Sequence, residues 1–176
     1  MPPVTPQAQL LSQAEARALA QQEGWPEKVL AYITRRPDEL LVFEHTAEYP
    51  EAGIQVPAGG VDAAETPEQA VLREVYEETG LRLSHPLDLV SQLWTTPAPS
   101  SIRHFYWLTA PQDTPDTWSH VVSDGQDDKG MTFLFRFAPL SDPQLISGYG
   151  FESALPALQK LQQHGPQNFK RSSPHD

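Results

Sequence analysis

The sequence contains no cysteine, so disulfide bonds, thiolate zinc sites and cysteine nucleophiles are all excluded. Basic residues are also scarce: 12 Lys and Arg stand against 23 Asp and Glu, which gives a formal net charge of −11. A field of this sign repels polyanions, and no run of basic residues offsets it. We therefore do not expect this chain to bind along a long nucleic acid.

Long apolar runs are missing as well. The longest clearly aliphatic stretch, residues 40–43, is far below the roughly 20 residues that cross a bilayer. The first nine residues have neither a cationic start nor an apolar segment, so no signal peptide is visible. Together with the absence of cysteine, these features predict a soluble, cytoplasmic protein that has no membrane partner.

The residues that are present suit one globular domain. The chain has 176 residues, of which 39% are hydrophobic and 20% are charged, enough for a sizeable core. We predict a helical N-terminal extension over residues 1–24 and the main domain over residues 25–163. Residues 164–176 lack periodicity and are predicted to form a flexible C-terminal tail.

Helix and strand patterns alternate along the chain. Capping patterns predict helices over residues 13–23 and 66–80, the second opened by Thr66 and Pro67. Strands are predicted at 28–35, 40–45, 54–56, 87–94, 102–109 and 131–137, and a last helix at 154–163. The polar segment 110–130 is predicted to be mainly a loop. This alternation favours an α/β fold, a mixed sheet with helices on both faces.

The predicted helix over 66–80 carries a concentration of acidic residues. Glu74, Glu77 and Glu78 stand at i, i+3 and i+4, so their side chains gather on one side of the helix. From residue 38 to residue 78 there are 11 acidic residues and one basic residue, Arg73. A solvated helix face is the common explanation for such a cluster. A site for hard divalent cations, Mg²⁺ or Mn²⁺, is the alternative.

A glycine pair before this helix favours the metal site. Gly59 and Gly60 let the backbone approach a ligand closely or adopt a positive φ, beside the carboxylates. Residues 59–81 fit the pattern G-x5-E-x7-R-E-U-x-E-E-x-G-U, where U is a bulky aliphatic residue. The matching residues are Gly59, Glu65, Arg73, Glu74, Val75, Glu77, Glu78, Gly80 and Leu81. On these residues the chain resembles the Nudix family of diphosphate hydrolases, in which this motif is the Nudix box.

The resemblance implies a Nudix-type α/β/α sandwich and roles for residues of the box. Glu74 and Glu78 would be the principal ligands of Mg²⁺ or Mn²⁺, with Glu77 as a third or bridging ligand. The backbone carbonyl of Ala58 would be a further metal contact. Arg73 and Glu65 would pair and so orient the loop against the helix. The role of this pair would be structural or catalytic.

The sequence does not decide which carboxylate acts as the general base. The resemblance implies either a box glutamate or an acid from a loop after the box. Asp127 and Asp128, in the polar segment 110–130, and Glu152 are the other candidates, although a solvated loop tip is the favoured explanation for the two aspartates. Trp118, in the same segment, is a further hypothesis as a lid residue.

The implied reaction cleaves the diphosphate linkage of a small nucleotide, or of a nucleoside diphosphate linked to another moiety. Trp94, Phe105, Tyr106 and Trp107 could stack on its base, but core packing is the simpler interpretation. Arg103 is either a phosphate ligand or a surface cation. The alternative function is a catalytically silent Nudix domain that senses a nucleotide or metabolite. The net charge disfavours RNA ends as substrate, and a homodimer through the N-terminal helix is a further hypothesis.

Overall fold

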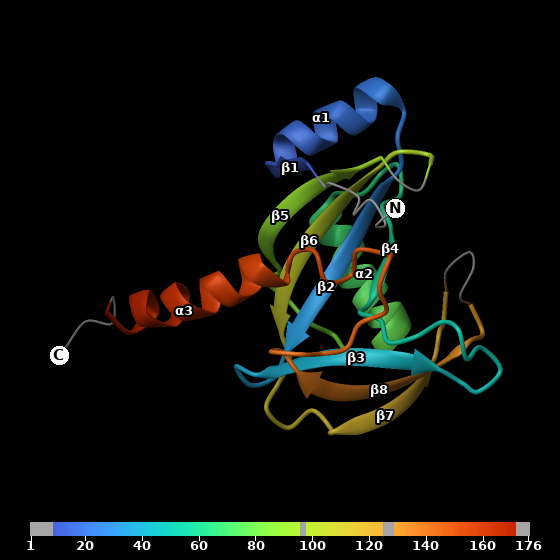
Figure 1. Cartoon of the computed structure of the whole chain (residues 1–176), viewed down its shortest axis with the longest axis vertical. Coiled ribbons are helices and arrows are strands. Elements are labelled where there is room, and N and C mark those ends of the chain that lie inside the picture. The colour runs from blue at the N-terminus through green and yellow to red at the C-terminus, as the bar shows by residue number, and fades with distance from the viewer. Residues whose placement is uncertain (1–8, 96–97, 125–128, 172–176) are drawn as a thin grey trace, which may run out of the picture.

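The alternating pattern folds into a mixed β-sheet with helices packed against it (Figure 1). The computed structural model describes residues 9–95, 98–124 and 129–171. Within these residues the strands are β1 (Gln9–Leu11), β2 (Glu27–Thr34), β3 (Glu39–His45), β4 (Ala58–Gly60), β5 (Leu87–Trp94), β6 (Ser101–Thr109), β7 (Thr117–Val121) and β8 (Thr132–Pro139). The helices are α1 (Gln13–Glu23), α2 (Pro67–Thr79) and α3 (Leu155–Arg171).

Strand β2 lies at the centre of the sheet, whose order is β1-β5-β6-β2-β3-β8-β7. It runs parallel to β6 and pairs with β3 only at Thr34 and Leu40, after which the two strands diverge. The edge that β2 thereby leaves open is taken by β4, with Lys28 opposite Gly60 and Leu30 opposite Ala58. This pairing brings the glycine loop of the Nudix box against the centre of the sheet.

The alternation of side chains along β2 divides the core into two layers. Val29, Ala31 and Ile33 lie in a cluster with Val71 and Val75 of α2. The residues between them, on the other face, lie in a second cluster with residues of α3: Leu30, Tyr32, Leu155 and Leu158. Helix α2 and the first turns of α3 therefore pack on opposite faces of the sheet, whereas the C-terminal part of α3 extends away from it (Figure 1). The predicted α/β sandwich with a mixed sheet is confirmed.

The N-terminal helix has the predicted bounds. Ser12 precedes it, and the Oγ atom of Ser12 accepts a hydrogen bond from the Glu15 N–H at 3.2 Å. Ala16 and Ala20 pack against Ile102 of β6, so this segment is joined to the main sheet. None of the described helices is long and apolar enough to pass through a bilayer.

Three predictions of secondary structure were wrong. Residues 54–56 form no strand, since Gln55 makes only an isolated bridge and the strand begins at Ala58. The polar segment 110–130 contains strand β7, because Thr117–Val121 pair with β8. The last helix does not end at 163 but runs to Arg171. The division of the chain into extension, domain and tail stays a prediction.

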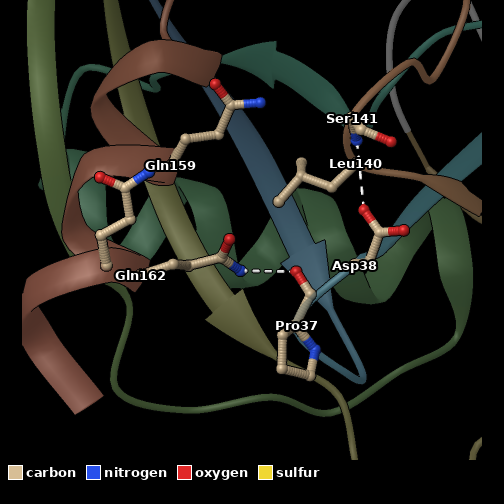
Figure 2. Close-up of a pocket in the computed structure, with 7 residues that line it drawn as sticks. Pro37, Asp38, Leu140, Ser141, Gln159 and Gln162 are labelled. Carbon is tan, nitrogen blue, oxygen red and sulfur yellow. Dashed lines mark hydrogen bonds between the residues drawn. The ribbon is translucent and has the colours of Figure 1, made fainter. Parts of the chain in front are cut away.

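Helix α3 meets the turn between β2 and β3 across a small hollow (Figure 2). Gln162 Nε2 donates to the Pro37 carbonyl at 2.9 Å, and Asp38 Oδ1 accepts a hydrogen bond from the Ser141 N–H at 3.3 Å. The hollow has a volume of about 300 Å³, and its one acidic lining residue, Asp38, is already bound to the backbone. The hydrogen bond from Gln162 ties α3 to the β2–β3 turn, and the hollow is not lined by the acidic residues of the box.

Candidate active site

Helix α2 has well-defined ends, and these set the position of every acidic residue on it. At its start, the Thr66 Oγ1 accepts from the Gln69 N–H at 3.2 Å, and the Gln69 side chain accepts from the Thr66 N–H at 2.9 Å. At its end, Gly80 adopts a φ of 82°, and its N–H donates to the Tyr76 carbonyl at 2.9 Å. The positive φ explains why glycine ends the helix.

The three glutamates of the box are buried. Glu74, Glu77 and Glu78 are 9%, 8% and 3% exposed, so the solvated helix face is excluded. Burying carboxylates is costly unless cations or hydrogen-bond donors lie beside them. Burial raises the pKa of Glu77 above its usual value, and the nearby Arg73 opposes this shift only in part.

Arg73 joins the loop of the box to the helix. Its Nε donates to Glu65 Oε2 at 3.0 Å and its Nη2 to the Gly60 carbonyl at 2.9 Å. Its Nη1 donates to Glu74 Oε1 at 2.8 Å and to Glu77 Oε2 at 3.2 Å. Hydrogen bonds with Arg73 hold the pKa of Glu65 below its usual value, and Glu65 in turn raises that of Arg73. The Arg73 guanidinium thus donates hydrogen bonds to three carboxylates, those of Glu65, Glu74 and Glu77.

The loop before the helix lies directly against the carboxylates. The Ala58 N–H donates to Glu78 Oε2 at 3.0 Å. A β-carbon at Gly59 would overlap the Glu74 carboxyl group, whereas one at Gly60 would meet no atom within 4 Å. Because Gly59 does not have a positive φ, close approach is the reason that glycine is needed there.

Of the three candidates for a general base outside the box, the structure describes only Glu152. Asp127 and Asp128 fall outside the described residues. Glu152 is exposed and acts electrostatically on Tyr32 and Arg103, so its interactions are with residues other than the box glutamates.

Sequence reasoning missed Asp124. It follows Ser123, whose N–H donates to the Glu77 carbonyl at 3.2 Å, and its charge adds to the rise in the pKa of Glu77 that burial mainly causes. The signal available in the sequence was its place at the start of the acidic segment that also holds Asp127 and Asp128. The fold, by pairing β7 with β8, is what brings this end of the segment to α2.

The aromatic residues considered for base stacking belong mainly to the core. Phe105 and Tyr106 are fully buried, and the Trp107 indole donates to Thr34. The guanidinium of Arg103 lies over the Trp94 ring, with its Cζ 4.3 Å from the ring centroid.

Arg103 is not a freely solvated surface cation. Its Nη1 donates to the Tyr149 carbonyl, and burial lowers its pKa.

Trp118 is not in a loop and does not form a lid. It lies in β7, and its indole Nε1 donates to the Thr79 carbonyl at the end of α2, at 2.9 Å. His120 of the same strand has its Nε2 3.1 Å from the Glu77 carbonyl oxygen. The sequence showed no spacing that linked β7 to the box, so this contact was also missed.

The chemistry of these groups fits a divalent cation. Within residues 9–95, 98–124 and 129–171, no three Asp, Glu or His side chains converge as a ready ligand sphere. Glu74 and Glu77 are held instead by Arg73, and Glu78 by the Ala58 N–H. The donors are buried carboxylate oxygens, the type that Mg²⁺ and Mn²⁺ prefer, and they outnumber the cation beside them.

Comparison with known families agrees with this geometry. The family model of the NUDIX domain matches residues 25–145. The chain belongs to the Nudix family. This Nudix domain is therefore related to hydrolases, and the resemblance seen in the box is confirmed over most of the sheet.

Two relatives match a short part of this Nudix domain. The NAD-capped RNA hydrolase NudC of Escherichia coli O157:H7 is 44% identical over 64 residues, 36% of this chain and 24% of that protein. The RNA pyrophosphohydrolase of Shewanella sediminis is 60% identical over 37 residues, 21% of this chain and 22% of that protein. The matches span less than a quarter of either relative's length.

Solved structures share the fold over more of the chain. A pyrophosphohydrolase of Bacillus subtilis, an E68A mutant, superposes with a TM-score of 0.54 and 25% identity, covering 80% of this chain and 83% of that one. The Nudix domain of Shewanella oneidensis NrtR, solved with ADP ribose, has a TM-score of 0.57 at 16% identity, covering 85% and 98%. The second likeness shows the fold alone.

Proposed function

We propose that this Nudix domain is a Mg²⁺- or Mn²⁺-dependent hydrolase that cleaves the diphosphate linkage of a small nucleotide or of a nucleoside diphosphate linked to another moiety. The observation that carries the proposal is the complete set of three buried glutamates packed against a glycine loop, of which Glu74 and Glu77 accept hydrogen bonds from Arg73 and Glu78 accepts one from the Ala58 N–H. A Nudix domain that only binds a nucleotide is expected to have lost some of the box carboxylates, and this chain retains all three.

Glu74, Glu78 and the Ala58 carbonyl would hold the metal. The N–H and C=O of a strand residue point to the same edge, and the Ala58 N–H points to Glu78. The Ala58 carbonyl is therefore expected on the edge of β4 that faces α2. When bound, Mg²⁺ or Mn²⁺ supplies charge neutralisation at the diphosphate oxygens and lowers the pKa of a bound water.

Glu77 is our candidate for the general base. Its carboxylate lies on the same side of α2 as those of Glu74 and Glu78 and would accept a proton from the attacking water. Arg73 holds this carboxylate at 3.2 Å and holds the loop through Glu65 and Gly60. In this scheme Arg73 orients the acids and the loop.

The names of the relatives suggest a second candidate, a nucleotide cap or phosphate at an RNA 5′ end. The linkage between the two nucleosides of NAD is a diphosphate, so the same site chemistry would serve a free dinucleotide and a capped RNA. The net charge of −11 disfavours a long RNA, and small nucleotides remain the first proposal. The cytoplasmic location and the homodimer stay predictions.

A substrate panel tests the proposal. Product release is measured with NADH, ADP-ribose, an NAD-capped oligonucleotide and a 5′-triphosphate oligonucleotide, each in Mg²⁺, Mn²⁺ or EDTA. We expect metal-dependent turnover that EDTA abolishes and that Glu78→Gln lowers by about 100-fold or more. Glu68→Gln, an exposed acid in the first turn of α2, is the matched control. Nucleotide binding without turnover on any compound would favour the sensor instead.

A further inference from the structure

The C-terminal end of α2 concentrates negative charge. Glu77 and Glu78 both lie in the last turn, which contains no basic residue. The unpaired carbonyl groups at this end of a helix already carry partial negative charge, so two carboxylates add to an unfavourable field. Hydrogen-bond donors from outside the helix are needed to stabilise this turn.

Strand β7 and the residues after it supply three such donors. The Trp118 indole Nε1 donates to the Thr79 carbonyl at 2.9 Å. The His120 Nε2 lies 3.1 Å from the Glu77 carbonyl oxygen, and the Ser123 N–H donates to the same oxygen at 3.2 Å. A carbonyl oxygen only accepts, so the Nε2 of His120 carries the hydrogen in this contact.

The donors themselves are held firmly. The Trp118 ring stacks on Phe135 of β8, with centroids 5.1 Å apart and planes 16° from parallel. Strand β7 pairs with β8 along its whole length. At the helix end, a β-carbon at Gly80 would lie 3.1 Å from His120 Nδ1, so the helix stop and this imidazole are in close contact. The strand and the last turn of α2 are thus fitted to each other.

We propose that Trp118 and His120 are positioning residues of the active site. They bind backbone carbonyls of the last turn and thereby set where the Glu77 and Glu78 carboxylates stand relative to β4. The Glu77 side chain is held at 3.2 Å by Arg73, and the Glu78 side chain is held at 3.0 Å by Ala58. A small shift of the turn therefore moves both carboxylates. The inference rests on the proposed metal-dependent hydrolysis.

Two single-residue variants remove the donors with little other change. Trp118→Phe keeps a ring that stacks on Phe135 and removes only the indole N–H. His120→Leu removes the imidazole donor, whereas His120→Gln places an amide N–H near the position of Nε2 and serves as the conservative rescue. Ser119→Ala is the matched control, since Ser119 is an exposed residue of the same strand.

The test is the affinity of the metal-free protein for Mn²⁺, measured by titration calorimetry without substrate, together with kcat and KM. Loss of a group that orients a metal ligand costs about 10- to 100-fold in affinity. Because these residues act through the backbone, we expect Trp118→Phe and His120→Leu to weaken Mn²⁺ binding by about 3- to 10-fold. We expect kcat to fall in parallel, KM to change less, and His120→Gln to regain most of the loss.

Thermal unfolding, followed on the same samples, separates positioning from stability. Variants that unfold at a lower temperature yet bind Mn²⁺ and turn over like the wild type would overturn the inference and leave the proposed function intact. Wild-type Mn²⁺ binding without turnover on any substrate would overturn the proposed function, while weakened Mn²⁺ binding in both variants would still support the positioning role. No Mn²⁺ binding by the wild type would overturn both.

Discussion

Gly59 lies so close to Glu74 that a methyl group at position 59 would occupy the space of the Glu74 carboxyl group. Gly59→Ala therefore has to displace this carboxylate or the loop. We expect at least about a 100-fold loss of turnover and a fall of about 1–3 kcal/mol in the free energy of unfolding. Gly60→Ala is the control, because its β-carbon would meet no atom within 4 Å. Equal effects of the two substitutions on turnover would contradict this explanation.

Removing the Arg73 guanidinium leaves Glu65, Glu74 and Glu77 without their shared donor. We expect Arg73→Gln to lower the free energy of unfolding by about 2–3 kcal/mol, measured by urea denaturation. Added Mn²⁺ should recover part of that loss, because a divalent cation neutralises the same carboxylates. Arg82→Gln, which alters an exposed arginine stacked on Tyr76, should change stability by less than about 0.5 kcal/mol. A deficit that Mn²⁺ leaves unchanged would argue against a metal beside Arg73.

His104 makes stability depend on pH. It is fully buried, with its Nδ1 2.7 Å from Ser91 Oγ and its Nε2 2.8 Å from Glu27 Oε1. Burial lowers the pKa of His104, and the attraction of Glu27 opposes this shift only in part. The unfolded chain therefore binds a proton at a higher pH than the folded chain does, so the stabilisation is present above about pH 6.5 and is lost as the pH falls below it.

Urea denaturation between pH 8 and pH 5 measures this effect. The wild type should lose stability as the pH falls, and His104→Gln should show a smaller loss over the same range. His85→Asn, a change at an exposed histidine with a φ of 55°, should keep the wild-type slope. A slope that is the same in His104→Gln and in the wild type would show that other groups cause the dependence.

Gly150 lies close against Trp94, although less close than Gly59 lies to Glu74. Its φ is 76°, and a β-carbon there would overlap the Trp94 ring and lie 2.8 Å from Arg103 Nη1. Gly148, with a φ of 89°, has open space around it. Both alanine substitutions strain the backbone, so the excess destabilisation of Gly150→Ala over Gly148→Ala measures the contact with Trp94. We expect an excess of about 1–3 kcal/mol in thermal or urea unfolding.

Much of the local structure could be predicted because its causes lie within a few residues. Thr66 and Gly80 mark the ends of α2 through hydrogen bonds to neighbours in the chain, and the predicted bounds agree with the structure. Alternation along the predicted strand 131–137 puts Met131, Phe133, Phe135 and Phe137 on one face, and all four pack in the cluster beneath α2. The box glutamates share a helix, so their common side followed from spacing alone.

Strand β7 could not be predicted from its own residues. Its five residues are mostly polar and lie near the surface. They form a strand because β8, the next strand in the chain, offers a partner edge. The opposite happens at residues 54–56, where Ile54 and Val56 pack in the core but only Gln55 pairs with another segment, through an isolated bridge to Phe43. Strand pairing depends on both segments, so the residues of one segment alone do not predict it.

The sequence by itself determined the family of this protein, its acidic helix and the kinds of group at its site, because these depend on residue identity and on spacing along one helix. Only the tertiary structure decided that the three glutamates are buried, that Gly59 is needed for close contact with Glu74, and that Asp124 and β7 meet the end of α2. Burial and contact between distant segments arise from packing, which the order of residues specifies only through the fold as a whole.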